Sequence, residues 1–216
     1  MINPHVEPYP GHLGLRIEVR SFIMQQGKDG DERVYRWRRS DGSSLEVLRV
    51  LVSHDDVCAR SRIVEAGVDP FAVEYEWRLD SSWHTRQLSV RVIRRDTAAL
   101  LIERTGDAAW RVDGQSRHDL DGCNEIDLAV TPFCNTLALR RFGPPPGGPG
   151  ELTALYVSFP DLTCVRSRQR YERLGPSTFK YVDLGVYAGF EARLIVDDEG
   201  MVRRYEGLFN LIERKP

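Results

Sequence analysis

Residues 71–92 read F-A-V-E-Y-E-W-R-L-D-S-S-W-H-T-R-Q-L-S-V-R-V, and this stretch decides the fold class. Large apolar side chains occupy every second position from 71 to 79, and again from 88 to 92. A period of two is typical of a β-strand with one buried face. The polar D-S-S-W-H-T segment between the two runs predicts a turn, so we expect an antiparallel hairpin.

The same alternation recurs at residues 126–130, 155–159 and 190–196. Asp-Gly dipeptides, which favour tight turns, separate several of these runs. No amphipathic helix longer than about three turns follows a 3.6-residue period. The pattern therefore predicts an all-β protein built from many antiparallel strands.

Proline and glycine content indicates the domain organisation. Residues 1–14 predict an irregular N-terminal arm, and F-G-P-P-P-G-G-P-G at 142–150 predicts a connector, because prolines and glycines exclude both helix and central strand. We expect a single domain over 15–216, with 15–141 and 151–216 as candidate halves.

A weak internal repeat is compatible with two related halves. The motif W-R-L-D at 77–80 and the motif L-I-V-D at 194–197 each end a strand-like run in an aspartate. Each is followed by a turn and, after five intervening residues, by an arginine, Arg86 or Arg203. Chance also produces such matches, since hairpins share turn chemistry.

Composition excludes several classes of protein. A net charge of −2 gives no overall field that would attract nucleic acid or an anionic membrane. The four cysteines lack C-x-x-C spacing and no histidine pair completes a metal site, so we expect no metal and no cofactor. No apolar run reaches the length of a membrane span, and the N-terminus does not resemble a signal peptide, so a cytoplasmic location is expected.

The segment 121–141, D-G-C-N-E-I-D-L-A-V-T-P-F-C-N-T-L-A-L-R-R, mixes polar and apolar residues. We interpret it as a strand–turn–strand unit that forms one wall of a polar pocket, with Pro132 ending the first strand. In a strand, Glu125 and Asp127 project from the same face. They could divide general acid and base roles, bind a ligand, or serve structure alone.

Seven short motifs point to one bacterial family. They are W-R (37–38) with D-G-S-S-L-E (41–46), D-S-S-W-H-T-R (80–86), L-D-G-C-N-E-I-D-L (120–128), T-P-F-C-N-T-L-A-L-R-R (131–141), F-P-D-L (159–162), Q-R-Y (169–171) and V-D-D-E-G-M-V-R-R-Y-E-G-L (196–208). Over roughly residues 33–212, the chain resembles the putative glycolipid-binding family, formerly a domain of unknown function.

The resemblance implies a strongly curved antiparallel sheet, a β-roll or open barrel similar to lipoprotein-carrier folds. It implies no catalytic residues. Two positions depart from the family pattern: Ala138 replaces an expected proline, and Glu125 replaces a small or apolar residue. A buried carboxylate at 125 would need a partner, such as one of the nearby arginines, or would have to face solvent.

The first functional hypothesis is a non-enzymatic protein that holds a glycolipid, or another amphipathic ligand, on the concave face of the sheet. Aromatic rings would supply an apolar wall and polar side chains would contact the head of the ligand. The candidate ligand-binding residues are Trp37, Glu46, Trp83, Arg86, Asp121, Asp127, Thr131, Asn135, Thr136, Arg140, Tyr171 and Tyr205.

The rival hypothesis is a hydrolase-like enzyme that acts on a carbohydrate or acyl substrate in the same cavity. Its acid and base would come from Glu46, Asp121, Glu125 and Asp127. Two carboxyl groups about 5–10 Å apart across an open pocket would favour this enzyme. Carboxylates buried against arginines would favour binding. A third alternative is a solid roll that works through a surface partner.

Overall fold

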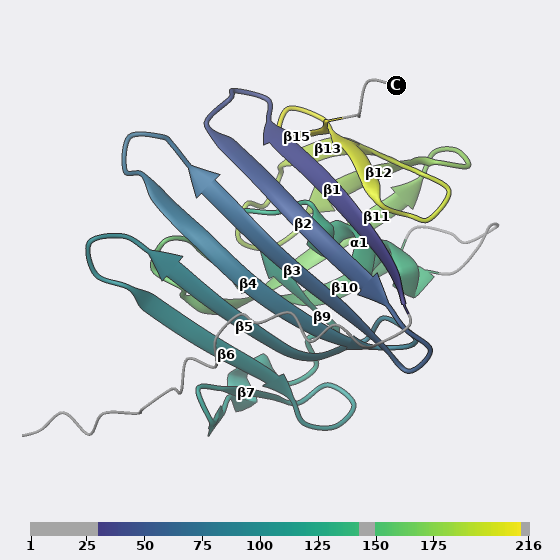
Figure 1. The fold of residues 1–216 in the computed structure, drawn as a ribbon. Coiled ribbons are helices and arrows are strands. Elements are labelled where there is room, and N and C mark those ends of the chain that lie inside the picture. The colour runs from purple at the N-terminus through teal and green to yellow at the C-terminus, as the bar shows by residue number, and fades with distance from the viewer. Residues whose placement is uncertain (1–29, 143–149, 213–216) are drawn as a thin grey trace, which may run out of the picture.

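A computed structural model describes residues 30–142 and 150–212 of the chain. The predicted arm at 1–14 and most of the predicted connector at 142–150 lie outside the described residues. The model confirms the all-β class, because fifteen strands form one sheet whose two outermost strands, β8 and β9, do not pair with each other. Figure 1 shows that this sheet is strongly curved.

The strands follow one another closely along the chain, and helical segments interrupt them only between β8 and β10. In sheet order the strands run β8-β7-β6-β5-β4-β3-β2-β1-β15-β14-β13-β12-β11-β10-β9. The bounds are β1 Asp31–Arg39, β2 Ser44–Val52, β3 Asp56–Glu65, β4 Phe71–Asp80, β5 Thr85–Ile93, β6 Ala98–Arg104, β7 Trp110–Val112, β8 Gln115–Ser116, η1 His118–Leu120, β9 Glu125–Leu128, α1 Phe133–Leu139, η2 Arg140–Phe142, β10 Gly150–Val157, β11 Cys164–Arg173, β12 Thr178–Asp183, β13 Glu191–Val196, β14 Val202–Tyr205 and β15 Phe209–Leu211.

The hairpin predicted over 71–92 is present as β4 and β5. The register pairs Tyr75 with Val90 and Trp77 with Leu88, and all four side chains point into the core. Trp77 is fully buried and donates a hydrogen bond from Nε1 to Thr85 Oγ1 at 2.9 Å. Alternation therefore determined both the strands and the face that they bury.

The segment 121–141 differs from the prediction. Only β9 is a strand, and it pairs with β10 in parallel, so the sheet is not wholly antiparallel. Parallel neighbours need a crossover connection, and that connection contains the helix α1. The predicted strand–turn–strand is therefore wrong: the T-P-F-C-N-T-L-A-L motif forms a helix and not a second strand.

Helix α1 lies in the concavity of the sheet. Figure 1 shows it between the strands β1–β7 and the strands β9–β13. All seven of its residues are buried, and the Phe133 ring lies 5.7 Å from the Trp77 ring in an edge-on arrangement. One continuous apolar core thus links both parts of the sheet through this helix. None of the helices within residues 30–142 and 150–212 has the length and hydrophobicity to cross a membrane.

Candidate functional site

The N-terminal end of α1 is held by a hydroxyl and faces a buried carboxyl group. Thr131 Oγ1 accepts a hydrogen bond from the Phe133 backbone N–H at 3.1 Å. Nearby, one carboxyl oxygen of Glu46 accepts hydrogen bonds from Ser61 at 2.7 Å and from Tyr75 at 2.9 Å. Burial raises the pKa of Glu46 to about 7. Thr131 thus holds the start of the helix, and Glu46 on β2 lies beside it.

The middle of α1 is bonded to β11 and β9. Asn135 Nδ2 donates to the Tyr171 hydroxyl at 3.0 Å, and that hydroxyl donates to Gln169 Oε1 at 3.2 Å. Asp127 accepts hydrogen bonds from the Cys134 thiol at 3.0 Å and from Gln169. Burial raises the pKa of Asp127, against the effect of these two bonds. This chain of bonds fixes the rotation of α1 about its own axis.

Glu125 has the arginine partner that its burial required. Its side chain is 1% exposed and forms a salt bridge with Arg141, while Thr85 Oγ1 lies 3.3 Å from its second oxygen. Arg141 also donates to the backbone carbonyls of Ser82 and Trp83. Of the two alternatives for a carboxylate at 125, an arginine partner or a solvent-facing position, the structure has the arginine partner. The same contacts bridge the gap between β9 and the β4–β5 turn.

The two turns of the predicted internal repeat have the same hydrogen-bonding pattern. In the β4–β5 turn, Asp80 Oδ1 accepts from the backbone N–H groups of Ser82 and His84, both at 2.9 Å. In the β13–β14 turn, Asp197 Oδ1 accepts from Glu199 at 3.0 Å and from Met201 at 2.9 Å. The aspartate of each repeat motif thus organises its turn in the same way.

The two turns differ at one equivalent position. Gly200 has φ +80°, a left-handed conformation that glycine adopts freely, but the corresponding residue is Trp83 with φ +65°. For a bulky residue this conformation is rare and costs about 1 kcal/mol or more. Strained residues of this kind cluster at binding and catalytic sites. The strained backbone therefore makes Trp83 a candidate binding-site residue.

Arg140 joins the two turns. Its guanidinium lies over the Trp83 ring, 3.9 Å from the centroid, and its Nη2 donates to the Glu199 carbonyl at 2.6 Å. Its Nε is buried without a hydrogen-bond partner in the described part of the chain. Burial lowers the pKa of Arg140. A half-buried guanidinium with an unused donor is a candidate ligand contact.

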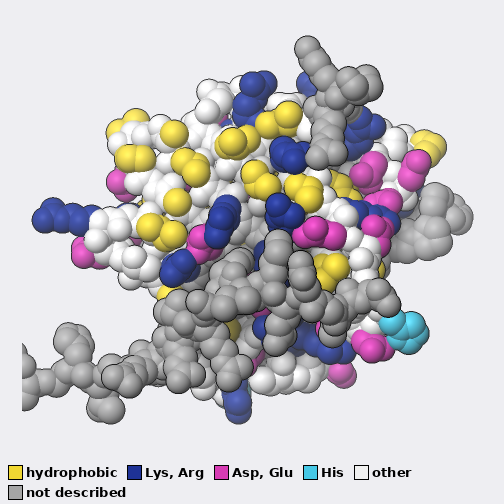
Figure 2. Space-filling model, in the orientation of Figure 1, with side chains coloured by type: hydrophobic (Ala, Val, Ile, Leu, Met, Phe, Trp, Pro, Cys, Tyr) yellow, Lys and Arg dark blue, Asp and Glu magenta, His cyan; other side chains and the backbone are white. Residues whose placement is uncertain are grey.

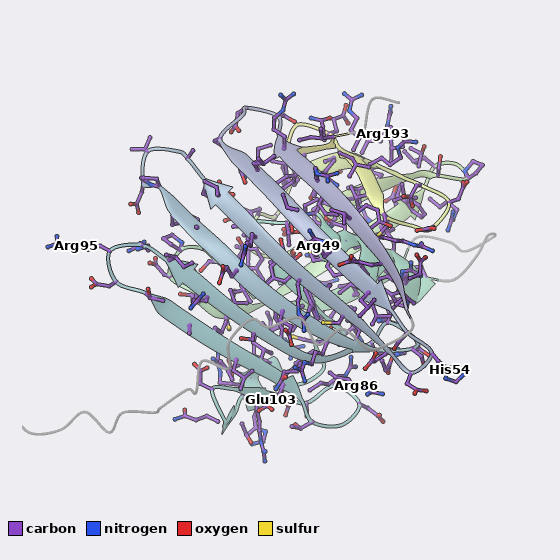
Figure 3. All side chains as sticks on the ribbon, viewed as in Figure 1. Arg49, His54, Arg86, Arg95, Glu103 and Arg193 are labelled. Carbon is purple, nitrogen blue, oxygen red and sulfur yellow. The ribbon has the colours of Figure 1, made fainter. Side chains whose placement is uncertain are left out.

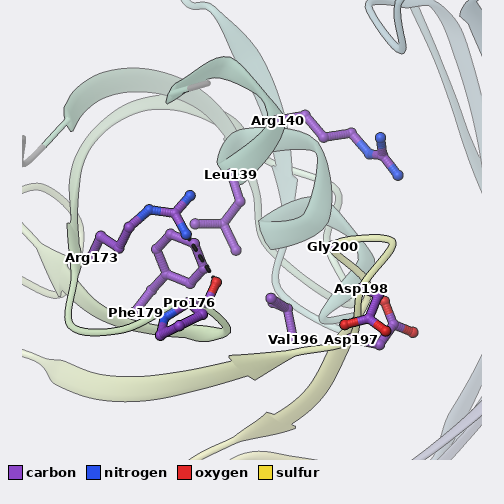
Figure 4. A pocket seen from close by; sticks show the side chains of 9 residues that line it. All are labelled: Leu139, Arg140, Arg173, Pro176, Phe179, Val196, Asp197, Asp198 and Gly200. Carbon is purple, nitrogen blue, oxygen red and sulfur yellow. Dashed lines mark hydrogen bonds between the residues drawn. The ribbon is translucent and has the colours of Figure 1, made fainter. Parts of the chain in front are cut away.

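A pocket of about 180 Å³ opens beside Arg140 (Figure 4). Its walls come from the end of α1, the β11–β12 turn and the β13–β14 turn, and we call it the Arg140 pocket. The Leu139 side chain projects into it from the helix (Figure 4). The lining residues are Leu139, Arg140, Arg173, Pro176, Phe179, Val196, Asp197, Asp198 and Gly200.

The structure separates the predicted site residues into three groups. Seven are buried or half-buried against one another around α1: Trp37, Glu46, Asp127, Thr131, Asn135, Thr136 and Tyr171. Trp83 and Arg140 lie together at the end of the helix. The other three are separate from these: Tyr205 is buried in an aromatic cluster with Tyr181 and Phe209 on β14, a strand that contacts α1. Asp121 lies in a loop bonded to His118 at 3.1 Å, and Arg86 lies on the solvent side of β5 (Figure 3).

Of the nine residues that line the Arg140 pocket, only Arg140 was predicted as a site residue. Leu139, Arg173, Phe179 and Asp198 illustrate why the others were missed. Leu139 belongs to the helix that was not predicted. Arg173 and Phe179 flank the L-G-P-S-T turn, which was readable only as a turn. Asp198 belongs to the repeat motif, but alternation does not show which turns meet in space.

The carboxyl groups of the rival enzyme hypothesis are dispersed. Glu46, Asp121, Glu125 and Asp127 contact different strands, and none of the four lines the Arg140 pocket. The acidic residues that line it are Asp197, which organises its own turn, and Asp198. Among residues 30–142 and 150–212, no group of three histidines, cysteines or acids is placed to hold a metal ion.

Comparison with known proteins agrees with this architecture. A solved structure of a DUF1089 family protein from Pseudomonas aeruginosa is 35% identical, with a TM-score of 0.69. The match covers 80% of this chain and 94% of that one. No curated protein matches the chain. The family model described as "Putative glycolipid-binding" matches residues 34–210, which include the whole of α1 and both repeat turns. The chain therefore belongs to the Putative glycolipid-binding family.

Proposed function

We propose that the protein binds the polar head of an amphipathic molecule, with a sugar as the preferred headgroup, in the Arg140 pocket and without chemical change. The observation that carries this proposal is the composition of the pocket. Leu139, Phe179 and Val196 give apolar walls, while Arg140 and Asp198 place a donor and an acceptor at the rim. Binding pockets commonly combine apolar walls with a few polar groups that fix orientation.

The chemistry of a sugar matches this rim. Each hydroxyl group both donates and accepts hydrogen bonds, whereas arginine only donates and a carboxylate only accepts. Arg140 and Asp198 together offer both functions without a large net charge. The Phe179 ring, which is 5% exposed and lies under the Arg173 guanidinium at 4.4 Å, contributes apolar wall for the ring carbons of a sugar. The lining holds two arginines, Arg140 and Arg173, and two aspartates, Asp197 and Asp198, so its charges balance, as suits a neutral headgroup.

The volume limits what enters. Pockets for drug-sized ligands span about 300–1,000 Å³, and the Arg140 pocket has about 180 Å³. We infer that a headgroup or a single ring occupies it, while an acyl chain lies outside. This places the ligand at the end of the roll, since the concave face is filled by α1.

The buried residues around α1 have a supporting role in this proposal. Asn135, Asp127 and Tyr171 fix the helix, and the helix carries Leu139 and Arg140 into the pocket. Binding is favoured over hydrolysis because the candidate carboxyl groups are already engaged. Glu125 forms a salt bridge with Arg141, and Glu46 and Asp127 accept hydrogen bonds from buried side chains. The cytoplasmic location expected from the sequence stays a prediction.

Titration with a short-chain alkyl glycoside tests the proposal, with the matching alkyl alcohol as the headgroup control. We expect the glycoside to bind in preference to the alcohol, with chemical-shift changes confined to the Arg140 pocket. Arg140→Ala and Asp198→Ala should each weaken binding about ten-fold, since each removes one or two hydrogen bonds to the sugar. Arg193→Ala, at an exposed position on β13 that does not line the pocket, is the matched control.

A second measurement concerns the natural ligand. Mass spectrometry of lipids extracted from the purified protein should detect an amphiphile that the Arg140→Ala variant retains less well. Equal binding of glycoside and alcohol, or binding that is unchanged in both pocket variants, would exclude a headgroup site at Arg140.

A further inference from the structure

We propose that the outer face of strands β1–β5 docks on an anionic lipid surface. The proposal is independent of the headgroup site, because no residue of β1–β5 lines the Arg140 pocket. Three neighbouring cross-strand rows form this surface, which we call the outer face. The rows are Arg38, Leu45, Val64, Ala72 and Ile93; Arg36, Val47, Arg62, Glu74 and Arg91; and Val34, Arg49, Arg60, Glu76 and Ser89.

The first row gives the outer face an apolar end. Leu45 is 47% exposed, Val64 56% and Ile93 38%, and the next row adds Val47 at 37%. Single exposed apolar residues are ordinary on any surface. These side chains are neighbours, however, because paired strands lie about 4.8 Å apart. Beyond Val64, the β3–β4 turn presents a fully exposed Val68 at the same end of the sheet. Figure 2 shows such apolar groups among arginines on this side of the molecule.

The charge of the outer face is opposite to that of the whole chain. Its three rows hold six arginines and two glutamates, whereas the chain has a net charge of −2. Glu74 pairs with Arg62 and Arg91, and Glu76 pairs with Arg60 at 2.8 Å. Among the described residues, these fifteen positions therefore carry four more arginines than acids, and Arg49 also pairs with Glu32 of the adjacent row at 3.3 Å. The adjacent cross-strand row consists of Glu32, Leu51, Cys58, Arg78 and Gln87. It adds one arginine and one acid, so the excess of arginines over acids stays the same.

A lipid surface fits this combination better than other partners. Arginines reach lipid phosphates while their aliphatic stems lie on apolar surface, and an apolar edge can enter the headgroup boundary. Anionic lipids attract such basic segments. A second copy of the chain, related by a two-fold axis, would bring the positive face against itself. Single-stranded nucleic acid favours aromatic stacking platforms, and none of the fifteen positions of the outer face is aromatic.

Vesicle flotation tests the proposal. The full chain should bind vesicles of equal parts phosphatidylglycerol and phosphatidylcholine, should not bind phosphatidylcholine alone, and should dissociate as salt screens the charges. Each arginine contributes roughly five-fold to such binding, so Arg49→Gln with Arg91→Gln should weaken it roughly twenty-fold. Leu45→Ser with Val64→Ser should weaken it about ten-fold.

The controls use equally exposed positions elsewhere. Val165→Ser with Val186→Ser, and Arg193→Gln with Arg204→Gln, should bind vesicles as the natural chain does. Circular dichroism establishes that every variant is folded, and Arg140→Ala should bind these sugar-free vesicles normally. Absence of binding to the anionic vesicles would overturn the proposal, as would equal losses in the control variants. Self-association that Leu45→Ser abolishes, without vesicle binding, would also overturn it and would assign the face to a second copy.

Discussion

The guanidinium of Arg140 lies 3.9 Å from the centroid of the Trp83 ring, and the same side chain donates a hydrogen bond to the Glu199 carbonyl. Arg140, the residue that follows the end of α1, therefore contacts two turns that are distant in sequence. Its neighbour Arg141 binds the carbonyls of the first of these turns. The paired arginines thus couple the end of the helix to the β4–β5 turn and to the β13–β14 turn.

Removal of the Arg140 side chain should expose the Trp83 ring. Trp37, Trp77 and Trp110 are at most 1% exposed, while Trp83 is half-buried. In Arg140→Ala we expect red-shifted emission and stronger acrylamide quenching of one tryptophan. A cation–π contact at this depth contributes about 1–2 kcal/mol, so the free energy of unfolding should fall by that amount. Trp83→Phe in the same background should abolish the fluorescence change. If quenching stays at the natural level, Arg140 does not cover the ring.

Loss of one partner of the Glu125–Arg141 pair should be costly. Arg141→Ala leaves a carboxylate that is 1% exposed without its counter-charge, and such uncompensated charges destabilise by about 3–5 kcal/mol. Glu125→Leu combined with Arg141→Met should recover most of this loss, since an apolar pair needs no counter-charge. Urea unfolding of the three proteins measures both effects. A double variant as unstable as Arg141→Ala would contradict the assignment of the penalty to the buried charge.

Glu46 should make stability depend on pH. Its pKa rises from 4.5 to about 7 on folding because of burial, so the native state keeps a proton that the unfolded chain releases. Stability should therefore decrease as the pH rises from about 4.5 to 7, by on the order of 3 kcal/mol, and then remain level. Glu46→Gln should remove this slope and be the more stable protein above pH 7. Glu32→Gln, at an exposed position, is the control and should keep the natural slope.

The two aspartates that organise the repeat turns should be energetically equivalent. Asp80 and Asp197 each accept two backbone hydrogen bonds, and a hydrogen bond near the surface contributes about 1 kcal/mol net. Asp80→Ala and Asp197→Ala should each lower the unfolding free energy by about 2 kcal/mol. Asp198→Ala, one residue beyond, should have little effect. A large difference between the two turns in chemical denaturation would argue against their equivalence.

The strands were predictable because alternation is a local signal. The 71–92 hairpin, the strand at 191–196 and the inward direction of Trp77 all follow from a period of two. Glu125 and Asp127, predicted to share a face of β9, contact consecutive helical segments: Glu125 pairs with Arg141 of η2, and Asp127 accepts a hydrogen bond from Cys134 of α1. The similarity of the turns at Asp80 and Asp197 was also visible in the sequence, as the repeated motif that ends in these two aspartates.

Helix α1 was not predictable from amphipathicity. A helix that is buried on every side carries no apolar stripe at a 3.6-residue period, and here even Asn135 and Thr136 are buried. The available signal was Thr131 followed by Pro132, a pair typical of helix starts, but the proline was equally compatible with a strand end. The Arg140 pocket could not be predicted for a related reason. Three segments that are distant in sequence form it, and a local sequence pattern does not show which segments are close in space.

The open sheet has consequences for solubility that follow from its two ends. Any uncovered edge strand invites pairing with another chain. Here one terminal strand, β8, has two residues, and the other, β9, has four and is joined by Glu125 to Thr85 and Arg141. A fifteen-stranded sheet therefore offers very little backbone to a neighbouring molecule. Substitutions that detach Arg141 from Glu125 would free β9 as well as weaken the fold, and aggregation would then accompany loss of stability.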